Sequence, residues 1–235
     1  MALEMTRLTT ESPEYVAARE DLRLAEIELM EHEERVATER RRLPPGPEVE
    51  NYVFEEGPRD LDAGDEPVHQ IALADLFSGP NRSLVIYHLM YGKAQTSPCP
   101  MCTMWLDGFN GVVDHVTQNA DFAIVAAADL PRLRAHARAR GWDRLRLLSA
   151  GAGTFKYDLN SEDDEGNQDS TLSVFTRDPD GTIRHFYTVH PWLSAEVRER
   201  GIDRLTPTWN LLDLIPQGRG DWYASLDYPG SGSSS

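Results

Sequence analysis

The pattern of apolar and polar positions begins with one long helical segment. Ser12, Pro13 and an acidic residue form a helix start signal, and helix formers continue to about Leu43. The run Pro44-Pro45-Gly46-Pro47 ends this helix. Apolar residues recur in it near helical spacing, namely Tyr15, Leu22, Ala25, Leu29 and Val36. We therefore predict an amphipathic helix that packs on the body of the protein or mediates self-association.

The rest of the chain alternates apolar runs of strand length with helical segments. We predict strands at 83–91, 121–127 and 145–148, helices at 99–117 and 130–140, and a strand or short turn at 71–77. Two further strands, 172–177 and 183–189, flank the hairpin signal Asp178-Pro179-Asp180-Gly181. Parallel βαβ units followed by an antiparallel hairpin predict an α/β protein of thioredoxin-like fold, with a central mixed sheet and helices on both faces.

These elements suggest four parts of the chain. Residues 1–47 hold the N-terminal helix and its stop, and 48–67 form an acidic, glycine-bearing linker with one short extended piece near Tyr52 to Phe54. The thioredoxin-like domain follows at 68–216. Residues 217–235 are a C-terminal tail that ends in low-complexity glycine and serine.

Composition narrows the classes of partner. The 235 residues carry 39 Asp and Glu against 23 Lys and Arg, a net charge of −16 that repels nucleic acid and anionic lipid surfaces. No apolar run reaches the roughly 18 residues of a membrane span, and the first residues lack a basic and apolar leader pattern. We expect a cytoplasmic protein with neither nucleic-acid nor membrane partners.

The two cysteines are the strongest chemical signal. Cys99 and Cys102 form a C-x-x-C pair, which is typical of a redox dithiol or of half a metal site, and a four-cysteine zinc site is impossible. The pair follows a buried strand and opens a helix, where unpaired N–H groups lower the pKa of a thiol. We therefore assign Cys99 as the nucleophile and Cys102 as the residue that resolves a mixed disulfide, with Pro100 in the first helical turn.

Sequence blocks around this pair carry a family resemblance. The blocks are Tyr87-His88-Leu89-Met90-Tyr91-Gly92, Cys99-Pro100-Met101-Cys102 and Trp105-Leu106-Asp107-Gly108-Phe109-Asn110-Gly111, together with Ser12-Pro13-Glu14-Tyr15, Tyr52-Val53-Phe54 and Ser173-Val174-Phe175. They resemble the bacterial domain-of-unknown-function 899 family, which is described as thioredoxin-like, over most of residues 11–216. The resemblance implies a thioredoxin-like fold and an oxidoreductase. Thioredoxins carry a cis-proline before the first hairpin strand, whereas this chain has Ser170-Thr171 there.

Asp107, the histidines and an acidic run can each be interpreted as functional or as purely structural. Asp107, five residues after Cys102 on the same predicted helix, is a candidate proton acceptor for the Cys102 thiol, or else a capping or solvated residue. His88 is a core histidine or a third ligand, beside Cys99 and Cys102, of copper or zinc. The more distant His185 and His190 follow the order of known copper-delivery sites poorly. The run from 160 to 169 holds five carboxylates and reads as a solvated loop.

Three hypotheses remain open at this point. The first is a thiol-disulfide oxidoreductase that acts on a disulfide, a peroxide or another small molecule and is reset by an external reductant. The second is a copper or zinc protein for metal delivery or oxidation of a small molecule, and the third is a redox-silent adaptor that forms a homo-oligomer through the long helix. The chain has no nucleotide or flavin motif, so we expect no organic cofactor.

Overall fold

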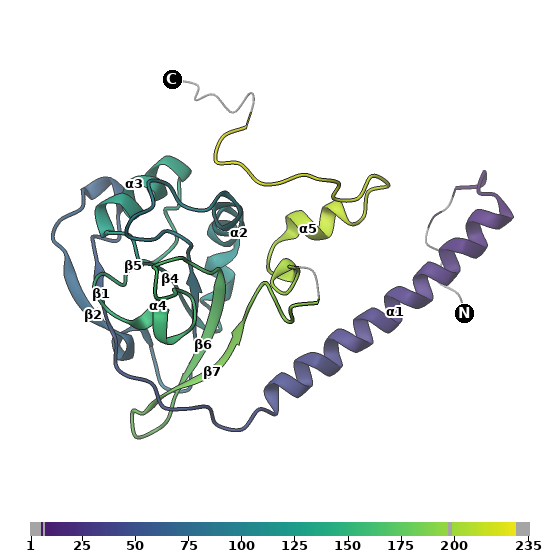
Figure 1. The fold of residues 1–235 in the computed structure, drawn as a ribbon. Coiled ribbons are helices and arrows are strands. Elements are labelled where there is room, and N and C mark those ends of the chain that lie inside the picture. The colour runs from purple at the N-terminus through teal and green to yellow at the C-terminus, as the bar shows by residue number, and fades with distance from the viewer. Residues whose placement is uncertain (1–5, 7, 197–198, 229–235) are drawn as a thin grey trace. The chain divides into compact units, whose positions relative to one another are not determined.

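The computed structural model describes residues 6, 8–196 and 199–228, in which the helices and strands are labelled as in Figure 1. The chain divides into two compact units, residues 1–45 and 46–235. Within the described part of the chain, every helix is too short or too polar to cross a membrane.

The first unit contains helix α1, Pro13–Arg41. The side chain of Ser12 accepts a hydrogen bond from the Tyr15 N–H at 3.1 Å, as the start signal predicts. Arg40 and Arg41 lie in the last turn, where the helix dipole favours cations. The helix is thus confirmed, but none of its side chains is buried, and Tyr15, Leu22 and Leu29 of the apolar stripe are exposed.

The second unit is built on one mixed sheet of seven strands in the order β2-β1-β5-β4-β3-β6-β7. The strands are β1 Val53–Glu56, β2 His69–Ala72, β3 Leu84–His88, β4 Asp121–Ala126, β5 Leu147–Ser149, β6 Thr171–Arg177 and β7 Ile183–Val189. Strands β3, β4 and β5 are parallel, whereas β6 and β7 form an antiparallel hairpin beside β3. The predicted βαβ units and hairpin are therefore confirmed.

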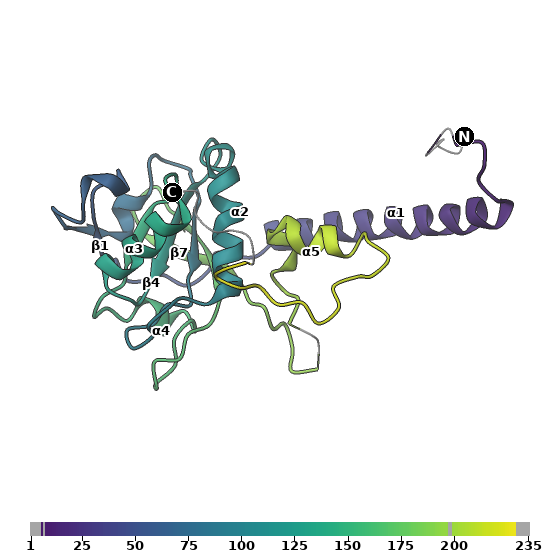
Figure 2. The same ribbon diagram turned by 90° about the horizontal axis from the view of Figure 1, so that it is seen from above.

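Helices cover both faces of this sheet, as the thioredoxin-like prediction requires (Figure 2). Helices α2 (Pro100–Val116) and α3 (Leu130–Arg140) pack on one face around Trp105, Leu133 and Trp142. Short helices η2 (Leu73–Leu76) and α4 (Phe155–Asp158) cover the other face with Phe54 and Phe175. The remaining helices are η1 Leu61–Ala63, η3 Asp203–Leu205 and α5 Pro207–Leu212.

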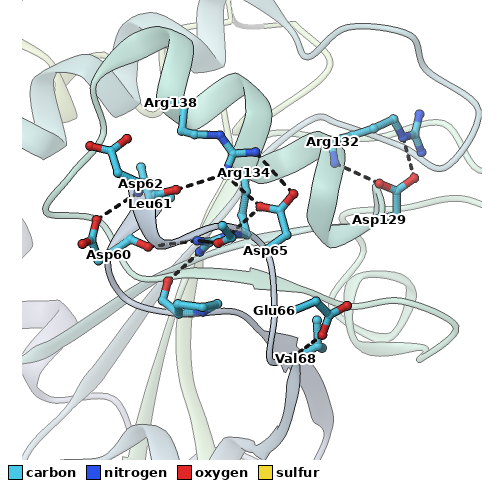
Figure 3. A network of polar contacts seen from close by, with 12 residues as sticks. Asp60, Leu61, Asp62, Asp65, Glu66, Val68, Asp129, Arg132, Arg134 and Arg138 are labelled. Carbon is cyan, nitrogen blue, oxygen red and sulfur yellow. Dashed lines mark hydrogen bonds and ion pairs between the residues drawn. The ribbon is translucent and has the colours of Figure 1, made fainter.

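Residues 48–67 differ from the predicted linker, because they belong to the sheet and its edge. Strand β1 pairs with β2 and, through Glu55, with Ser149 of β5. The loop after β1 is held by the buried guanidinium of Arg134 on α3 (Figure 3). That guanidinium donates to the carbonyl oxygens of Pro58, Asp60 and Gly64 and to the Asp65 carboxylate, at 2.7–3.2 Å.

A second arginine completes this anchor. Arg138, one turn further along α3, donates to the Leu61 carbonyl at 3.1 Å and to the Asp65 carboxylate at 2.8 Å (Figure 3). The two guanidinium groups, Arg138 first, hold the pKa of Asp65 below its usual range. The Asp65 carboxylate, which the sequence places in an acidic linker, is thus bound by two arginines of a helix about 70 positions later.

Candidate active site around the dithiol

The path of the chain after β3 places the cysteines at the carboxyl end of the sheet. The N–H of Cys99 donates to the Met90 carbonyl at 2.9 Å, which brings the start of α2 back against the end of the strand. Cys99 is the N-cap of α2 and Pro100 is its first residue. The N–H and the hydroxyl of Thr103 donate to the Cys99 carbonyl at 3.0 and 3.1 Å and so fix the first turn.

The Cys99 thiol is half-buried and is set up to ionise. A hydrogen bond from Cys102 makes the largest contribution to lowering the pKa of Cys99, and burial of the thiol opposes this shift. The N–H groups of Cys102 and Met101 and the side chain of Tyr223 lower the pKa further, to about 6. The groups at the start of α2, the Cys102 thiol first, therefore favour the charged form of Cys99.

The Cys102 thiol, three residues later, has the opposite character. Its side chain is 1% exposed, and this burial, followed by the hydrogen bond with Cys99 and the negative charge of Cys99, raises its pKa well above the ordinary value. A hydrogen bond with the Tyr87 side chain opposes the rise. The structure thus brings the two predicted cysteines together as one acidic thiol and one thiol that holds its proton.

Three polar side chains that interact with Cys102, directly or through a hydrogen bond, have no counterpart in the sequence-based site. The hydroxyl of Tyr87 is hydrogen-bonded to that of Ser170 at 2.9 Å, and Tyr87 is fully buried. Lys156 of α4 is 1% exposed, and its ammonium donates to the Leu89 carbonyl at 3.0 Å. Burial lowers the pKa of Lys156 to about 8, and the charges of Cys102, Glu162 and Asp169 oppose this.

Strand alternation in β3 could have identified Tyr87, because its neighbour His88 points to the other face. Tyr87 belongs to the core under α2, whereas the His88 ring stacks on Phe155 with centroids 5.2 Å apart. Lys156 carries no comparable signal, since a lysine in a four-residue helix reads as a surface residue. Ser170, at the position where thioredoxins have their cis-proline, lines the same cavity as both cysteines.

The dithiol lies in a cavity of about 210 Å³. The cavity is lined by Met90, Cys99, Met101, Cys102, Trp105, Ser170 and Pro191 and by the later residues Glu199, Ile202, Asp203, Trp209, Arg219 and Tyr223. The second group belongs to residues 199–226, which we name the covering segment. The covering segment includes the first part of the predicted tail 217–235. Residues 217–226 pack on the folded unit, because Ala224 is buried and the Arg140 guanidinium donates to the Leu226 carbonyl at 3.1 Å. Residues 229–235 lie outside the described residues.

Asp107 has other partners than the dithiol. Its carboxylate accepts hydrogen bonds from the Trp142 indole at 2.8 Å and from the Arg140 guanidinium, with which it forms an ion pair. These contacts join α2 to the end of α3. Asp107 lines a different depression, which also includes Met104 and Pro207. The structure therefore supports a role for Asp107 in helix packing.

His88 likewise lies apart from the cysteines. It is fully buried, and its Nε2 is hydrogen-bonded to the Ser173 hydroxyl at 3.0 Å. Burial, followed by the charge of Lys156, keeps its pKa well below the ordinary value. No group of three histidine, cysteine or carboxylate side chains suited to a metal ion occurs among the described residues. The geometry thus gives no support to the copper or zinc alternative.

The remaining histidines and the acidic loop lie elsewhere. His185 is hydrogen-bonded to the Thr188 hydroxyl at 2.6 Å and lines a separate depression with His190. In the acidic loop, the Asp163 carboxylate accepts hydrogen bonds from the N–H groups of Glu165 and Asn167 at 3.0 and 2.8 Å. These bonds hold a local turn.

Solved structures similar to this chain include peroxiredoxins. Reduced Prx3 of Vibrio vulnificus in complex with H2O2 is 16% identical, with 69% of this chain and 99% of that chain covered and a TM-score of 0.46. AhpC of Mycobacterium tuberculosis is 15% identical, with 74% and 97% covered and a TM-score of 0.45. The reduced 2-Cys peroxiredoxin of Plasmodium vivax is 12% identical, with 68% and 93% covered and a TM-score of 0.46.

Sequence comparison places the chain in a family. No curated protein matches the chain. The sequence profile described as "Bacterial protein of unknown function (DUF899)" matches residues 5–229, almost the whole chain. The resemblance seen in the blocks around Cys99 and Cys102 is confirmed, and the chain belongs to the DUF899 family of bacterial proteins of unknown function.

Proposed function

We propose that the protein is a thiol-disulfide oxidoreductase in which Cys99 is the nucleophile and Cys102 resolves the intermediate. The observation that carries this proposal is the contrast between the two thiols. Cys99 is half-buried with a pKa lowered to about 6, whereas Cys102 is 1% exposed with a raised pKa. Attack requires an accessible thiolate, and resolution requires a second thiol that is protected from outside reagents.

The reaction proceeds in two steps. The Cys99 thiolate attacks one atom of a weak S–S or O–O bond of the acceptor, forms a bond to it, and releases the other atom as a thiolate or an oxyanion that takes up a proton. Cys102 then loses its proton and attacks the Cys99 sulfur, which expels the second half of a disulfide or, from a sulfenic acid, water. Two electrons have passed to the acceptor, and the product is a Cys99–Cys102 disulfide.

The buried polar groups support the second step. Cys102 carries a negative charge when it attacks, and its hydrogen bond with Tyr87 stabilises that charge. The buried ammonium of Lys156 adds a positive charge that interacts with Cys102. Both groups interact with Cys102, whereas the Cys99 thiolate is stabilised by groups at the start of α2.

The partners of this cycle follow from its chemistry. An external dithiol or thiol reductant returns two electrons to the disulfide, and we place the cycle in the cytoplasm, where such reductants are present. The dithiol works without a resident metal in this proposal. Self-association through α1 is part of the proposal too, because Leu22, Leu29 and Met30 expose apolar surface on that helix.

A thiol-trapping redox titration tests the proposal. Metal-free protein is equilibrated in glutathione and dithiothreitol buffers, and free thiols are alkylated and counted by intact mass. We expect one reversible two-electron transition between about −120 and −270 mV, the range of working dithiols. A pair that stays reduced throughout, or that oxidises irreversibly, would rule the proposal out.

A further inference from the structure

The cavity over the dithiol is closed on one side by the covering segment, residues 199–226. Ile202 and Trp209 of this segment are 3% and 7% exposed and belong to the core cluster that also holds Cys102. The Trp105 indole on α2 donates to the Ile202 carbonyl at 3.4 Å. The segment is therefore packed on the first turns of α2 as part of the folded unit.

A network of ion pairs holds the segment in its own shape. Arg219 pairs with Asp203 and with Asp213, the latter at 2.6 Å, and Arg200 joins the same two carboxylates. The Arg219 guanidinium also lies over the Trp209 ring, 4.7 Å from its centroid. These contacts join one set of residues, namely 200, 203, 209, 213 and 219, into a single network. Within it, Trp209 lines the cavity that holds the dithiol.

A close backbone approach fixes the start of this segment. The N–H of Gly201 donates to the Pro191 carbonyl at 2.7 Å. A Cβ at Gly201 would lie 2.0 Å from the His190 carbonyl oxygen and 2.9 Å from that of Pro191. No side chain fits there unless the backbone moves, so the covering segment and residues 190–191 are fixed against each other.

The size of the cavity limits what reaches the sulfurs. A protein substrate would have to bring several residues of its own chain up to the dithiol, and even a transient interface between two proteins needs several hundred Å² of accessible surface. The cavity here has about 210 Å³, less than the roughly 300 Å³ at the lower end of ordinary ligand pockets, and Trp209 and Tyr223 form part of its wall. Such a space admits a small molecule and excludes a folded protein.

The charge of the cavity favours an uncharged molecule. Glu199 and the Cys99 thiolate contribute negative charge to its wall, whereas the charges of Asp203 and Arg219 are paired with each other. The rest of the lining is largely apolar or aromatic, from Met90, Met101, Trp105, Ile202 and Trp209. An anionic acceptor therefore meets repulsion at the site as well as the chain's net charge of −16.

We propose that the covering segment restricts the dithiol to small, uncharged and largely apolar acceptors that carry a weak S–S or O–O bond, and that it excludes protein disulfides. This inference rests on the proposed oxidoreductase function and names its substrate class. With a hydroperoxide ROOH, the Cys99 sulfur bonds to the terminal oxygen, the O–O bond breaks and ROH leaves. With a disulfide RSSR, the S–S bond breaks and two RSH leave in turn. Cys99 and Cys102 end as a disulfide in both reactions, and a dithiol reductant returns the two electrons.

The experiment compares four acceptors on the reduced, full-length protein. They are cumene hydroperoxide, the uncharged hydroxyethyl disulfide, the anionic glutathione disulfide, and insulin as a protein disulfide. The rate of Cys99–Cys102 disulfide formation is followed by acid quench and intact mass. We expect at least one of the two uncharged acceptors to react about tenfold or more faster than glutathione disulfide, and insulin to be slowest. The two uncharged arms tell an O–O from an S–S substrate.

Variants of the covering segment make the test specific. Gly201→Ala displaces the segment and Trp209→Ala removes its inner wall, and neither changes a cysteine. We expect both to raise the rate with insulin relative to the small uncharged acceptor by about tenfold, whereas Leu214→Ala, at a residue that is 75% exposed on the same segment, leaves the ratio unchanged. Circular dichroism shows whether each variant is folded. Because two different substitutions open the cavity, the test still works if one of the two variants does not fold.

The outcomes separate the two proposals. If no acceptor forms the Cys99–Cys102 disulfide in the full-length protein or in either open variant, the proposed function fails and the substrate class fails with it. If insulin or glutathione disulfide reacts as fast as the small uncharged acceptors, or if both open variants keep the native ratio, the function stands and the substrate inference is overturned.

Discussion

The two sides of the first turn of α2 differ sharply, although only three positions separate their sulfurs. On the cavity side, Cys99 meets N–H groups and Tyr223, and its charged form is favoured. On the sheet side, Cys102 is enclosed by the core, where it is hydrogen-bonded to Tyr87 and interacts with the charge of Lys156, and burial favours its neutral form. The comparison shows that the spacing of a dithiol sets the distance between its sulfurs, whereas the elements packed on each side set their reactivity.

Replacing each cysteine in turn should break this contrast most strongly. Cys99→Ser should abolish reaction with every acceptor, because no other accessible thiol exists in the sequence. Cys102→Ser should still attack and then stop, so that the mixed disulfide or sulfenic acid on Cys99 accumulates. Intact mass after reaction with one equivalent of acceptor distinguishes the two variants. A trapped adduct in Cys99→Ser would reverse the assignment of roles.

The pH dependence of alkylation should show the same contrast in the native protein. The folded state lowers the pKa of Cys99 to about 6, so its reaction with iodoacetamide should be fast at neutral pH and fall as pH drops through that value. Cys102, with its pKa raised by burial, should remain unmodified over the same range. Peptide mapping after timed alkylation gives both profiles. A midpoint for Cys99 near that of an ordinary thiol would contradict the geometry of the helix start.

Removing the buried amine of Lys156 should change the reactivity of Cys102 and not that of Cys99. Lys156→Met should slow the attack of Cys102 about tenfold, because the Cys102 thiolate loses its nearby positive charge. The alkylation profile of Cys99 should be unchanged, and this separates an effect on Cys102 from general unfolding. Lys93→Met, at an exposed lysine in a long ion pair of 3.9 Å with Glu162, is the matched control. Equal behaviour of the two variants would remove Lys156 from the mechanism.

The smallest effect is expected at Asp107. Asp107→Asn keeps an oxygen for the Trp142 indole but weakens the ion pair with Arg140, so the free energy of unfolding should fall by about 1 kcal/mol or less. Urea denaturation measures this loss. The rate of Cys102 attack and its pH profile should not change. A slower attack with unchanged stability would restore Asp107 as the proton acceptor that its position on the helix suggests.

Local signals in the sequence account for much of the fold. The α3 boundaries follow from Asp129, whose side chain caps the first turn, and from Gly141, which takes a left-handed φ of +68° at the end. The strand before the dithiol follows from its apolar run, and the position of Cys99 at the start of α2 follows from Pro100 in the first helical turn. Each of these signals is contained within a few residues, so a single sequence displays them.

The features that the sequence did not reveal depend on distant contacts. Nothing near Pro58 or Asp65 indicates that Arg134 will bind them, and nothing near Trp209 indicates that it will wall the dithiol. The burial of Lys156 likewise depends on strands from other parts of the chain. The charge and hydropathy of these segments are those of a linker or a tail. Only the distant residues that they contact show that the segments are part of the folded unit.

The Arg134 anchor also bears on the order of folding. Its hydrogen bonds join positions 69 to 76 residues apart, so the first of them to form closes a long loop of chain, at an entropic cost that grows with the length of the loop. The loop at 58–65 gains its partner only after α3 has formed and docked. In pulse-labelling hydrogen exchange, amide protection at 58–65 should therefore appear later than in the adjacent parallel strands β3 and β4, which makes this edge of the sheet a late step of folding.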